Sequence, residues 1–322
     1  MKKNKNTIIN LAIAVLVYMA VMILTTRGFL NRQMTSLIIP ICIYVILAVS
    51  LSLVVGFLGE LSLGHAGFMS VGAYTGGIFL IQTQDKLPAF VSLIGALLLG
   101  GISAAIMGTI IGIPVLRLKG DYLAIVTLGF GEIIKSIINS MTNITGGPKG
   151  LSRIPLLTNQ ANFTFVFILV LISILLVSNL VNSRHGRAIC AVRDNYIAAE
   201  AVGIFVSKFK IMAFVIAAFL AGVAGVIFAG NIGILKPVQF DYNMSIEILV
   251  MVVLGGMGNI KGAIIAATIL TLLPEVLRGA SDYRMLLYAI VLIGMMLFNN
   301  SDLRKNFLER QNLKKKVKGE VS

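Results

Sequence analysis

The sequence predicts an all-α polytopic membrane protein with about 8 to 10 transmembrane helices. Of its 322 residues, 57% are hydrophobic and only 12% are charged, whereas a soluble domain has about 25% charged residues. So few charges cannot cover a soluble surface. Apolar runs close to the ~20 residues that cross a bilayer also recur along the chain. Helices are expected because a spanning segment must satisfy its own backbone hydrogen bonds in lipid.

The apolar runs give candidate spans in order along the chain. The first run follows three lysines, but it is too long for a signal peptide and lacks a cleavage site, so we expect an uncleaved helix. The chain then divides into an N-terminal helix and outer loop at 1–36, a membrane domain at 37–298 and a basic tail at 299–322. The candidate spans are 8–26, 35–55, 61–82, 89–114, 121–140, 161–181, 210–230, 246–258, 262–277 and 285–298.

Positive charges predict the orientation. Lys and Arg gather in the central loop at 182–210 and in the tail, and such loops face the cytoplasm. The N- and C-termini are therefore expected to be cytoplasmic. The net charge of +14 does not indicate a nucleic-acid partner, because the charges lie in loops between apolar runs. An even number of crossings must follow the central loop. Two short helices within 246–277 would give that number, and a re-entrant hairpin is the alternative.

Two glycine-rich stretches interrupt the apolar runs, at 56–77 and 255–262. Glycine lets helices approach closely in a bilayer, and polar groups there must face protein or water. We therefore expect broken or re-entrant segments inside the bundle. Gly72 and Gly76 are one turn apart, which predicts a helix–helix contact. Paired broken helices are typical of transporters with internal repeats.

Polar residues at membrane depth are candidates for a transport pathway or for buried polar contacts. Glu132 and Lys135 share a helix face and can form an ion pair, and a structural role and a pathway role both remain open. A backbone carbonyl is the expected partner of His65. Glu247 is expected to open a span, where the helix dipole favours a carboxylate. The candidates are Glu60, His65, Glu132, Lys135 and Asn259, the last of which can cap a short helix.

Catalytic signatures are missing from the sequence. It contains no Gly-x-Ser-x-Gly, HExxH or CxxC pattern. The stretch GGMGNIKG lacks the ending of a phosphate-binding loop. We therefore expect no enzyme activity, no cofactor and no metal site. Cys42 and Cys190 are expected at different depths, which makes a disulfide unfavourable. Transport without an ATP site needs an external motor or an ion gradient, unless it is passive.

The central loop is predicted to contain one amphipathic helix. Gly186 acts as a breaker, and a helix follows from Arg187 to Val202. One stripe of this helix carries Ile189, Val192, Tyr196 and Ala199. The helix lies either on the lipid headgroups or in the groove of a partner protein.

Several motifs resemble a known family. The loop RHGRAICAVRDNYIAAEAVGI (184–204) is similar to the cytoplasmic coupling segment of ABC-importer permeases. Four other stretches narrow this resemblance to the LivM-type permeases of bacterial branched-chain amino-acid transporters, over roughly residues 37–298. They are GFLGELSLGHAGFMSVGAY (56–74), RLKGDYLAIVTLGFGEI (117–133), TGGPKGL (145–151) and VLGGMGNIKGAIIAA (253–267).

The resemblance implies a subunit of an ATP-driven importer in the bacterial inner membrane. Its partners would be cytosolic ATP-binding subunits that hydrolyse ATP, a second related permease and an extracytoplasmic binding protein, besides membrane lipid. The expected substrate is leucine, isoleucine or valine. Coupling to the ATPase is assigned to Arg187, Arg193, Asp194, Glu200 and Gly203. A permease for urea or short amides remains an alternative, as do a passive channel and an ion-coupled transporter that uses Glu60, Glu132 or Lys135.

Overall fold

The computed structural model describes residues 15–25, 31–116, 118, 120–277, 289–290 and 293. These residues form helices and loops without a β-strand, which confirms the all-α prediction. Their contacts divide the chain into two units, Met1–Thr271 and Leu272–Ser322. The packing described below belongs to the first unit. Arg117, Lys119 and the basic tail lie outside the described residues, so the structure does not report on the charges that they contribute.

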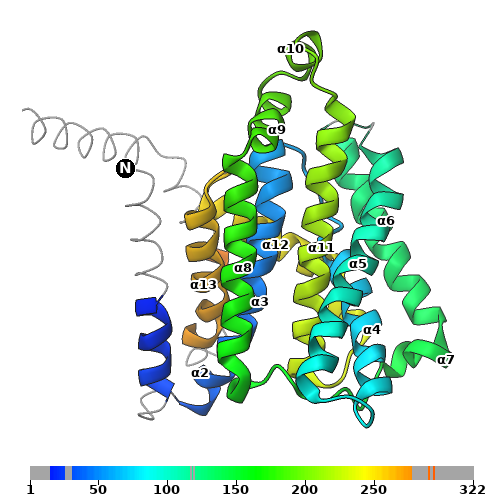
Figure 1. Cartoon of the computed structure of the whole chain (residues 1–322), viewed down its shortest axis with the longest axis vertical. Helices are drawn as coiled ribbons and strands as arrows, with labels where there is room; N and C mark the ends of the chain where they lie inside the picture. Colours follow the sequence, from blue (N-terminus) through cyan, green and yellow to red (C-terminus); the bar gives the residue numbers. More distant parts are fainter. Residues whose placement is uncertain are drawn as a thin grey trace, which may run out of the picture. The chain divides into compact units, whose positions relative to one another are not determined.

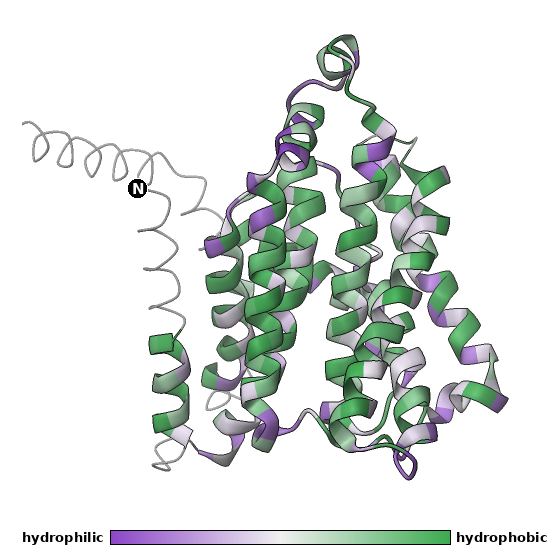
Figure 2. Ribbon diagram, viewed as in Figure 1, coloured by the Kyte–Doolittle hydropathy of each residue, from purple (hydrophilic) through white to green (hydrophobic). Residues whose placement is uncertain are grey.

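Six helices among the described residues are long and apolar enough to cross a membrane. Figure 2 shows apolar residues along their lengths and polar residues gathered toward their ends. The six segments are Gln33–Leu58, α5 (Ala89–Val115), α6 (Asp121–Ser140), Gln160–Asn182, α11 (Val206–Ile232) and Pro237–Gly255. Residues Val15–Thr25 form a shorter apolar helix within the predicted first span. The predicted span 285–298 lies almost wholly outside the described residues.

Shorter elements complete the bundle (Figure 1). The segment Gln33–Leu58 contains α3 and the π-helix η1, which is a common irregularity at functional sites. The remaining elements are α2 (Arg32–Ser36), α3 (Ile38–Ser52), η1 (Leu53–Leu58), α4 (His65–Thr83), α7 (Thr142–Thr145), η2 (Gly147–Lys149), η3 (Gln160–Asn162), α8 (Phe163–Asn182), α9 (Arg184–Asp194), α10 (Tyr196–Ala201), η4 (Pro237–Phe240), α12 (Tyr242–Gly255) and α13 (Ile260–Val276).

The centre of the bundle is formed by α4, α5 and α11, which pack closely on one another. Glycines make this possible. A Cβ atom on Gly72 would lie 2.3 Å from the Cα of Gly222. One on Gly222 would lie 2.5 Å from the carbonyl oxygen of Gly100. The three helices therefore meet backbone to backbone, and the predicted contact at Gly72 is confirmed.

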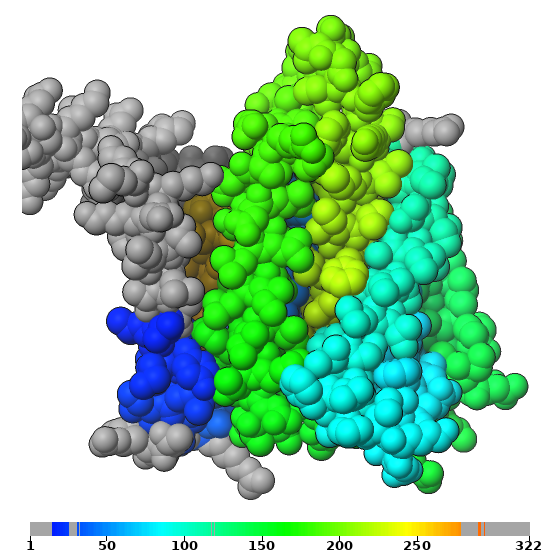
Figure 3. Space-filling model, in the orientation of Figure 1, coloured from blue at the N-terminus to red at the C-terminus, as the bar shows by residue number. Residues whose placement is uncertain are grey.

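Helix α3 is the most deeply buried span, because it packs against both α8 and α11. In the segment Gln33–Leu58, which contains α3, 83% of an 18-residue apolar stretch is buried. Figure 3 shows α8 and α11 on one face, with atoms of α3 visible between them. This position explains why α3 is apolar on all sides, as expected of a helix surrounded by others.

Helix α4 begins inside the bundle rather than at its end. The π-helix ends at Gly59, which has a φ of 78°. Residues 59–64 are not helical and connect the π-helix to α4. His65 is buried, and its Nε2 lies 2.8 Å from the Ser50 hydroxyl of α3. The prediction that His65 bonds a backbone carbonyl is therefore wrong, because its partner is the Ser50 side chain of the adjacent helix. The next amide, that of Ala66, donates to the Ser245 hydroxyl of α12 at 3.0 Å.

The segment that leads to α12 is also extended. Leu235 and Leu151 exchange backbone hydrogen bonds of 2.8 and 2.9 Å, which hold residues 233–236 against the loop after α7. Asp241 then caps α12, since its carboxylate accepts from the amide of Met244. Because the helix starts at Tyr242, Glu247 lies more than a turn inside it. The prediction that Glu247 opens this span is wrong.

A glycine break separates α12 from α13, as predicted for the run 246–277. Gly256 and Gly258 have φ values of 90° and 79°, which other residues adopt with strain. Asn259 immediately precedes α13, and its carbonyl accepts from the amide of Ala263 at 3.0 Å. The run therefore forms two helices rather than one.

The central loop forms two helices, α9 and α10, at the end of the bundle away from α7 (Figure 1). The single helix predicted from Arg187 to Val202 is wrong because Asn195 interrupts it. Its backbone is extended, with a φ of −159°, and its side chain accepts from the amides of Ile197 and Ala198. Gly186 is not a breaker either. It lies within α9, where a Cβ would be 2.1 Å from the carbonyl oxygen of Val181.

Candidate transport cavity and coupling contacts

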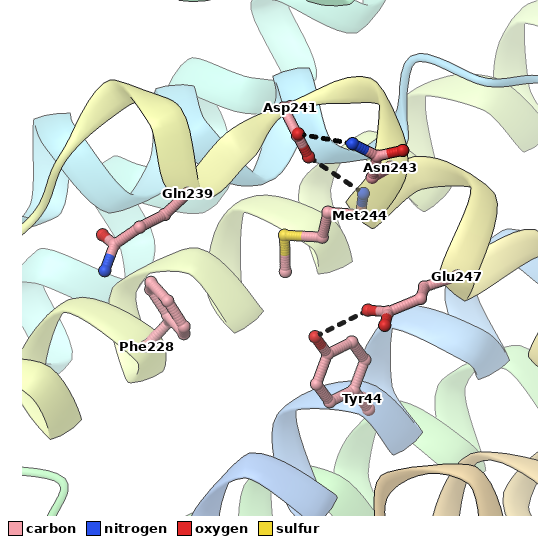
Figure 4. A pocket seen from close by; sticks show the side chains of 7 residues that line it. All are labelled: Tyr44, Phe228, Gln239, Asp241, Asn243, Met244 and Glu247. Carbon is pink, nitrogen blue, oxygen red and sulfur yellow. Dashed lines mark hydrogen bonds between the residues drawn. The ribbon is translucent and has the colours of Figure 1, made fainter. Parts of the chain in front are cut away.

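A cavity of about 220 Å³ lies among α3, α11, η4 and α12. Ligand sites for drug-sized molecules usually enclose about 300–1,000 Å³, so this cavity suits a small solute. Two of its residues, Tyr44 and Glu247, lie well inside the apolar segments Gln33–Leu58 and Pro237–Gly255, which are long enough to cross a membrane. Figure 4 shows the seven lining residues: Tyr44, Phe228, Gln239, Asp241, Asn243, Met244 and Glu247.

Glu247 is the exposed acid of this cavity. The Tyr44 hydroxyl donates to its Oε2 at 3.2 Å and links α3 to α12 (Figure 4). Within the described part of the chain, Glu247 forms no ion pair with Lys, Arg or His. A carboxylate inside a membrane span is costly without a cation or water beside it, and such residues usually belong to a solute or ion pathway.

Asp241 lines the same cavity but has a structural task. Its two carboxylate oxygens accept from the amide of Met244 at 3.2 Å and from Nδ2 of Asn243 at 2.8 Å. It therefore caps α12 and fixes where that helix begins. An N-cap of this kind typically stabilises a helix by about 1 kcal/mol.

The wall opposite Tyr44 and Glu247 carries the Phe228 ring and, beside it, the Gln239 side chain (Figure 4). Phe228 of α11 and Met244 of α12 supply an aromatic ring and a thioether. The ring of Phe228 packs edge-on against Phe240, with 5.5 Å between centroids. Phe240 in turn contacts Tyr74 of α4. The wall is thereby fixed to the central helices.

A second, narrow crevice adjoins the cavity at Asp241. It lies between α4, α6 and α12 and is too narrow for a water molecule. Its lining includes Ala66, Glu132 and Ser245. The amide of Ala66 and the hydroxyl of Ser245 close one side of it by their hydrogen bond.

The predicted polar residues lie elsewhere. Glu132 and Lys135 form the expected ion pair, at 2.7 Å on α6. Glu60 forms an ion pair with Lys210 of α11, and the two side chains are only 12% and 8% exposed. None of these residues, nor His65 or Asn259, lines the cavity of Figure 4. The sequence analysis did not identify Tyr44, Phe228 or Asp241 as residues of the cavity. For Glu247, its position as an acid within an apolar run could have indicated a cavity residue.

The predicted coupling residues lie in or beside α9 and α10, and Arg193 connects them to the bundle. Its Nη1 donates to the carbonyl oxygen of Gly56 at 3.1 Å, and its Nη2 is 2.9 Å from Asp194. Arg187 and Glu200 are exposed. Gly203 follows α10 with a φ of 84°, the left-handed conformation that suits glycine after a helix.

No group of three or more His, Cys, Asp or Glu side chains among the described residues could hold a metal ion. The side chains that line the cavity supply two carboxylates, two amides, a phenol and two apolar groups. This set can bind a small solute by hydrogen bonds, charge and apolar contact.

Comparison with known proteins identifies the family. The family described as "Branched-chain amino acid transport system / permease component" matches residues 33–298. The chain belongs to this family. The permease is 36% identical to the high-affinity branched-chain amino acid transport system permease protein LivM of Escherichia coli K12, over 81% of the chain and 67% of the relative.

More distant relatives carry other names. The permease is 28% identical to a probable branched-chain amino acid transport permease protein LivM of Methanocaldococcus jannaschii, over 68% of the chain and 74% of the relative. It is 26% identical to the autoinducer 2 import system permease protein LsrC of Yersinia pseudotuberculosis PB1/+, over 89% of the chain and 83% of the relative. No solved structure matched the chain. The family and the six apolar helices identify a multi-pass membrane protein, and the family is one of permeases rather than of enzymes.

Proposed function

We propose that this permease subunit carries branched-chain amino acids into the cell as part of an ATP-driven importer. The observation that carries the proposal is the 36% identity to LivM over 81% of the chain. The cavity agrees with it, because a small mixed polar and apolar site suits a small amino acid better than a nucleotide or a large lipid.

The importer needs partners. Cytosolic ATP-binding subunits would supply ATP hydrolysis, a second related permease would complete the pathway, and an extracytoplasmic binding protein would deliver the substrate. We place α9, α10 and both termini in the cytoplasm of a bacterial cell, with the chain in its inner membrane. The basic character of the loop 182–210 supports this orientation.

The α10 region is the proposed docking surface for the ATP-binding subunit. Ile197, Val202 and Phe205 are 64%, 77% and 78% exposed there. Three large apolar side chains at the tip of a polar loop favour insertion into a groove on another protein. Membrane lipid is the alternative occupant, but α10 lies beyond the α9 end of the bundle (Figure 1).

Two cationic side chains would pass movement of this surface to the end of η1 and to the non-helical residues 59–64. Arg193 of α9 bonds the carbonyl of Gly56, and Lys210 of α11 pairs with Glu60. This segment leads directly into α4, whose first turn bonds α3 and α12. Closure of the ATPase pair would thereby shift α4 and open the crevice beside Asp241. Such rigid-body movement is a common way to switch between packed states.

Reconstitution tests the function. The purified chain would be combined with its ATP-binding subunits, second permease and binding protein in proteoliposomes. We expect leucine uptake that requires ATP inside the vesicles and loaded binding protein outside them, and that stops without either. Uptake by the permease alone, driven by a proton gradient, would instead indicate an ion-coupled transporter. Uptake of urea or a short amide in place of leucine would assign the alternative substrate.

A further inference from the structure

We propose that the Glu247 carboxylate, oriented by the Tyr44 hydroxyl, binds the α-ammonium group of the amino acid in transit, while Phe228 and Met244 contact its apolar side chain. The inference rests on the proposed function, which supplies the class of solute. It adds the residues that distinguish an amino acid from other small solutes. These residues come from three different elements, α3, α11 and α12.

The charge of the cavity supports a cationic group. Its lining contains two carboxylates and neither Lys nor Arg among the described residues. Asp241 already accepts two hydrogen bonds that hold the start of α12. Glu247 accepts one, from Tyr44, and is exposed at the cavity. Glu247 is thus the carboxylate with acceptor capacity left for an ammonium group, and charge-assisted bonds of this kind are stronger than neutral ones.

The geometry also accounts for the apolar part of the substrate. Tyr44 and Glu247 lie on one side of the cavity, and Phe228 lies across from them (Figure 4). A branched aliphatic side chain packs favourably against an aromatic ring and a flexible thioether. A simple carboxylic acid would bring its negative charge beside two carboxylates, without an ammonium group to offset the repulsion. The same cavity therefore selects for a small solute with a cationic end and an apolar end.

Uptake by the complete importer in proteoliposomes tests the role of Glu247. We expect Glu247→Gln to lower leucine uptake by about tenfold to a hundredfold, the effect of losing one bond between charged groups. Co-purification of the ATP-binding subunits with the variant checks that the complex still assembles. Glu247→Asp keeps the charge and should retain part of the uptake. Wild-type uptake by Glu247→Gln would overturn the proposal.

Chemical protection gives a measurement that does not depend on the activity of the variant. A single cysteine, Gln239→Cys, would be placed in the cavity after Cys42 and Cys190 are replaced by alanine, so that both hydrogen bonds to Asp241 are kept. We expect leucine to protect it from a small thiol reagent, and 4-methylpentanoate, which is leucine without its amino group, to give no protection. Adding Glu247→Gln should abolish protection by leucine. Equal protection by both compounds would contradict recognition of the ammonium group.

The outcomes separate the two proposals. If the wild-type importer does not take up leucine, the proposed function fails. If it takes up leucine and neither uptake nor protection depends on Glu247, only the inference about Glu247 fails. If the Glu247→Gln complex does not assemble, protection of the single cysteine by leucine and by 4-methylpentanoate can still be compared in the chain that retains Glu247. That comparison tests recognition of the ammonium group.

Discussion

At the scale of single residues, Gly72 is a position where the helix packing leaves no room for a side chain. Even one methyl group there would overlap the backbone of Gly222. We expect Gly72→Ala to lower stability by about 1–3 kcal/mol, the usual cost of overpacking. The measurement is the thermal unfolding midpoint of the purified protein in detergent.

Gly129 of α6 is the matched control, because a Cβ there would meet nothing within 4 Å. Gly129→Ala should leave the midpoint unchanged or raise it, since alanine favours a helix over glycine. Equal effects of the two substitutions would show that the contact between Gly72 and Gly222 contributes little.

Lys210 gives a second prediction at this scale. Lys210→Met would leave the Glu60 carboxylate buried without its cation, which typically costs about 3–5 kcal/mol. Replacing both partners, as Glu60→Gln with Lys210→Met, should recover much of the loss. The unfolding midpoints of the single and double variants measure this coupling. Lys208→Met, at an exposed neighbour on the same helix, should have little effect, and a comparable loss there would argue against the buried pair.

Local sequence explains which residue contacts could be predicted. The pairing of Glu132 with Lys135 follows from their spacing on one helix. The left-handed backbone at Gly203 follows from its place after a helix. By contrast, Glu60 and Lys210 are 150 positions apart, and Tyr44 and Glu247 are 203 apart. Such pairs depend on which helices pack together, and nothing in the local sequence specifies that.

At the scale of elements, the lengths of the apolar runs predicted the helices well where the thickness of the bilayer determines helix length. The range 121–140 coincides with α6, and the range 89–114 differs from α5 by one residue. Prediction failed where a polar side chain caps a helix inside an otherwise periodic stretch. Asn195 divides the expected helix of the central loop, and Asp241 moves the start of α12 upstream. The sequence alone does not show which Asn or Asp will cap a helix, because the cap depends on the local backbone conformation.

The α10 element carries a prediction about coupling. Glu200→Lys combined with Gly203→Val should abolish the stimulation of ATP hydrolysis by loaded binding protein in the purified complex. The first change reverses an exposed charge, and the second strains a left-handed backbone by roughly 1 kcal/mol. The permease should still enter the membrane, because neither Glu200 nor Gly203 lies in an apolar segment long enough to cross it.

Asp85→Lys is a suitable control for that variant. It reverses an exposed charge in the loop between α4 and α5, which lies at the end of the bundle away from α10 (Figure 1). We expect it to leave the stimulation of ATP hydrolysis intact. Full stimulation in the α10 double variant would mean that the coupling surface lies elsewhere on the permease.

At the scale of the whole molecule, the proposed orientation predicts two different labelling patterns. In a chain without Cys42 and Cys190, an impermeant thiol reagent added to intact cells should label Asp85→Cys. It should label Ser207→Cys, at the start of α11, only after the membrane is opened. Labelling of Ser207→Cys from outside would reverse the orientation and place α9 and α10 away from the cytosolic ATP-binding subunits.

The late start of α4 has a consequence for biogenesis. This helix is interior to the bundle, yet it is not among the six segments apolar enough to cross a membrane by themselves. A nascent segment with so many glycines and a buried histidine gains little from entering lipid alone. It packs closely on α5, which follows directly in the chain and is strongly apolar. We therefore expect the translocation machinery to hold α4 until α5 emerges from the ribosome, so that the two enter the bilayer together as a hairpin.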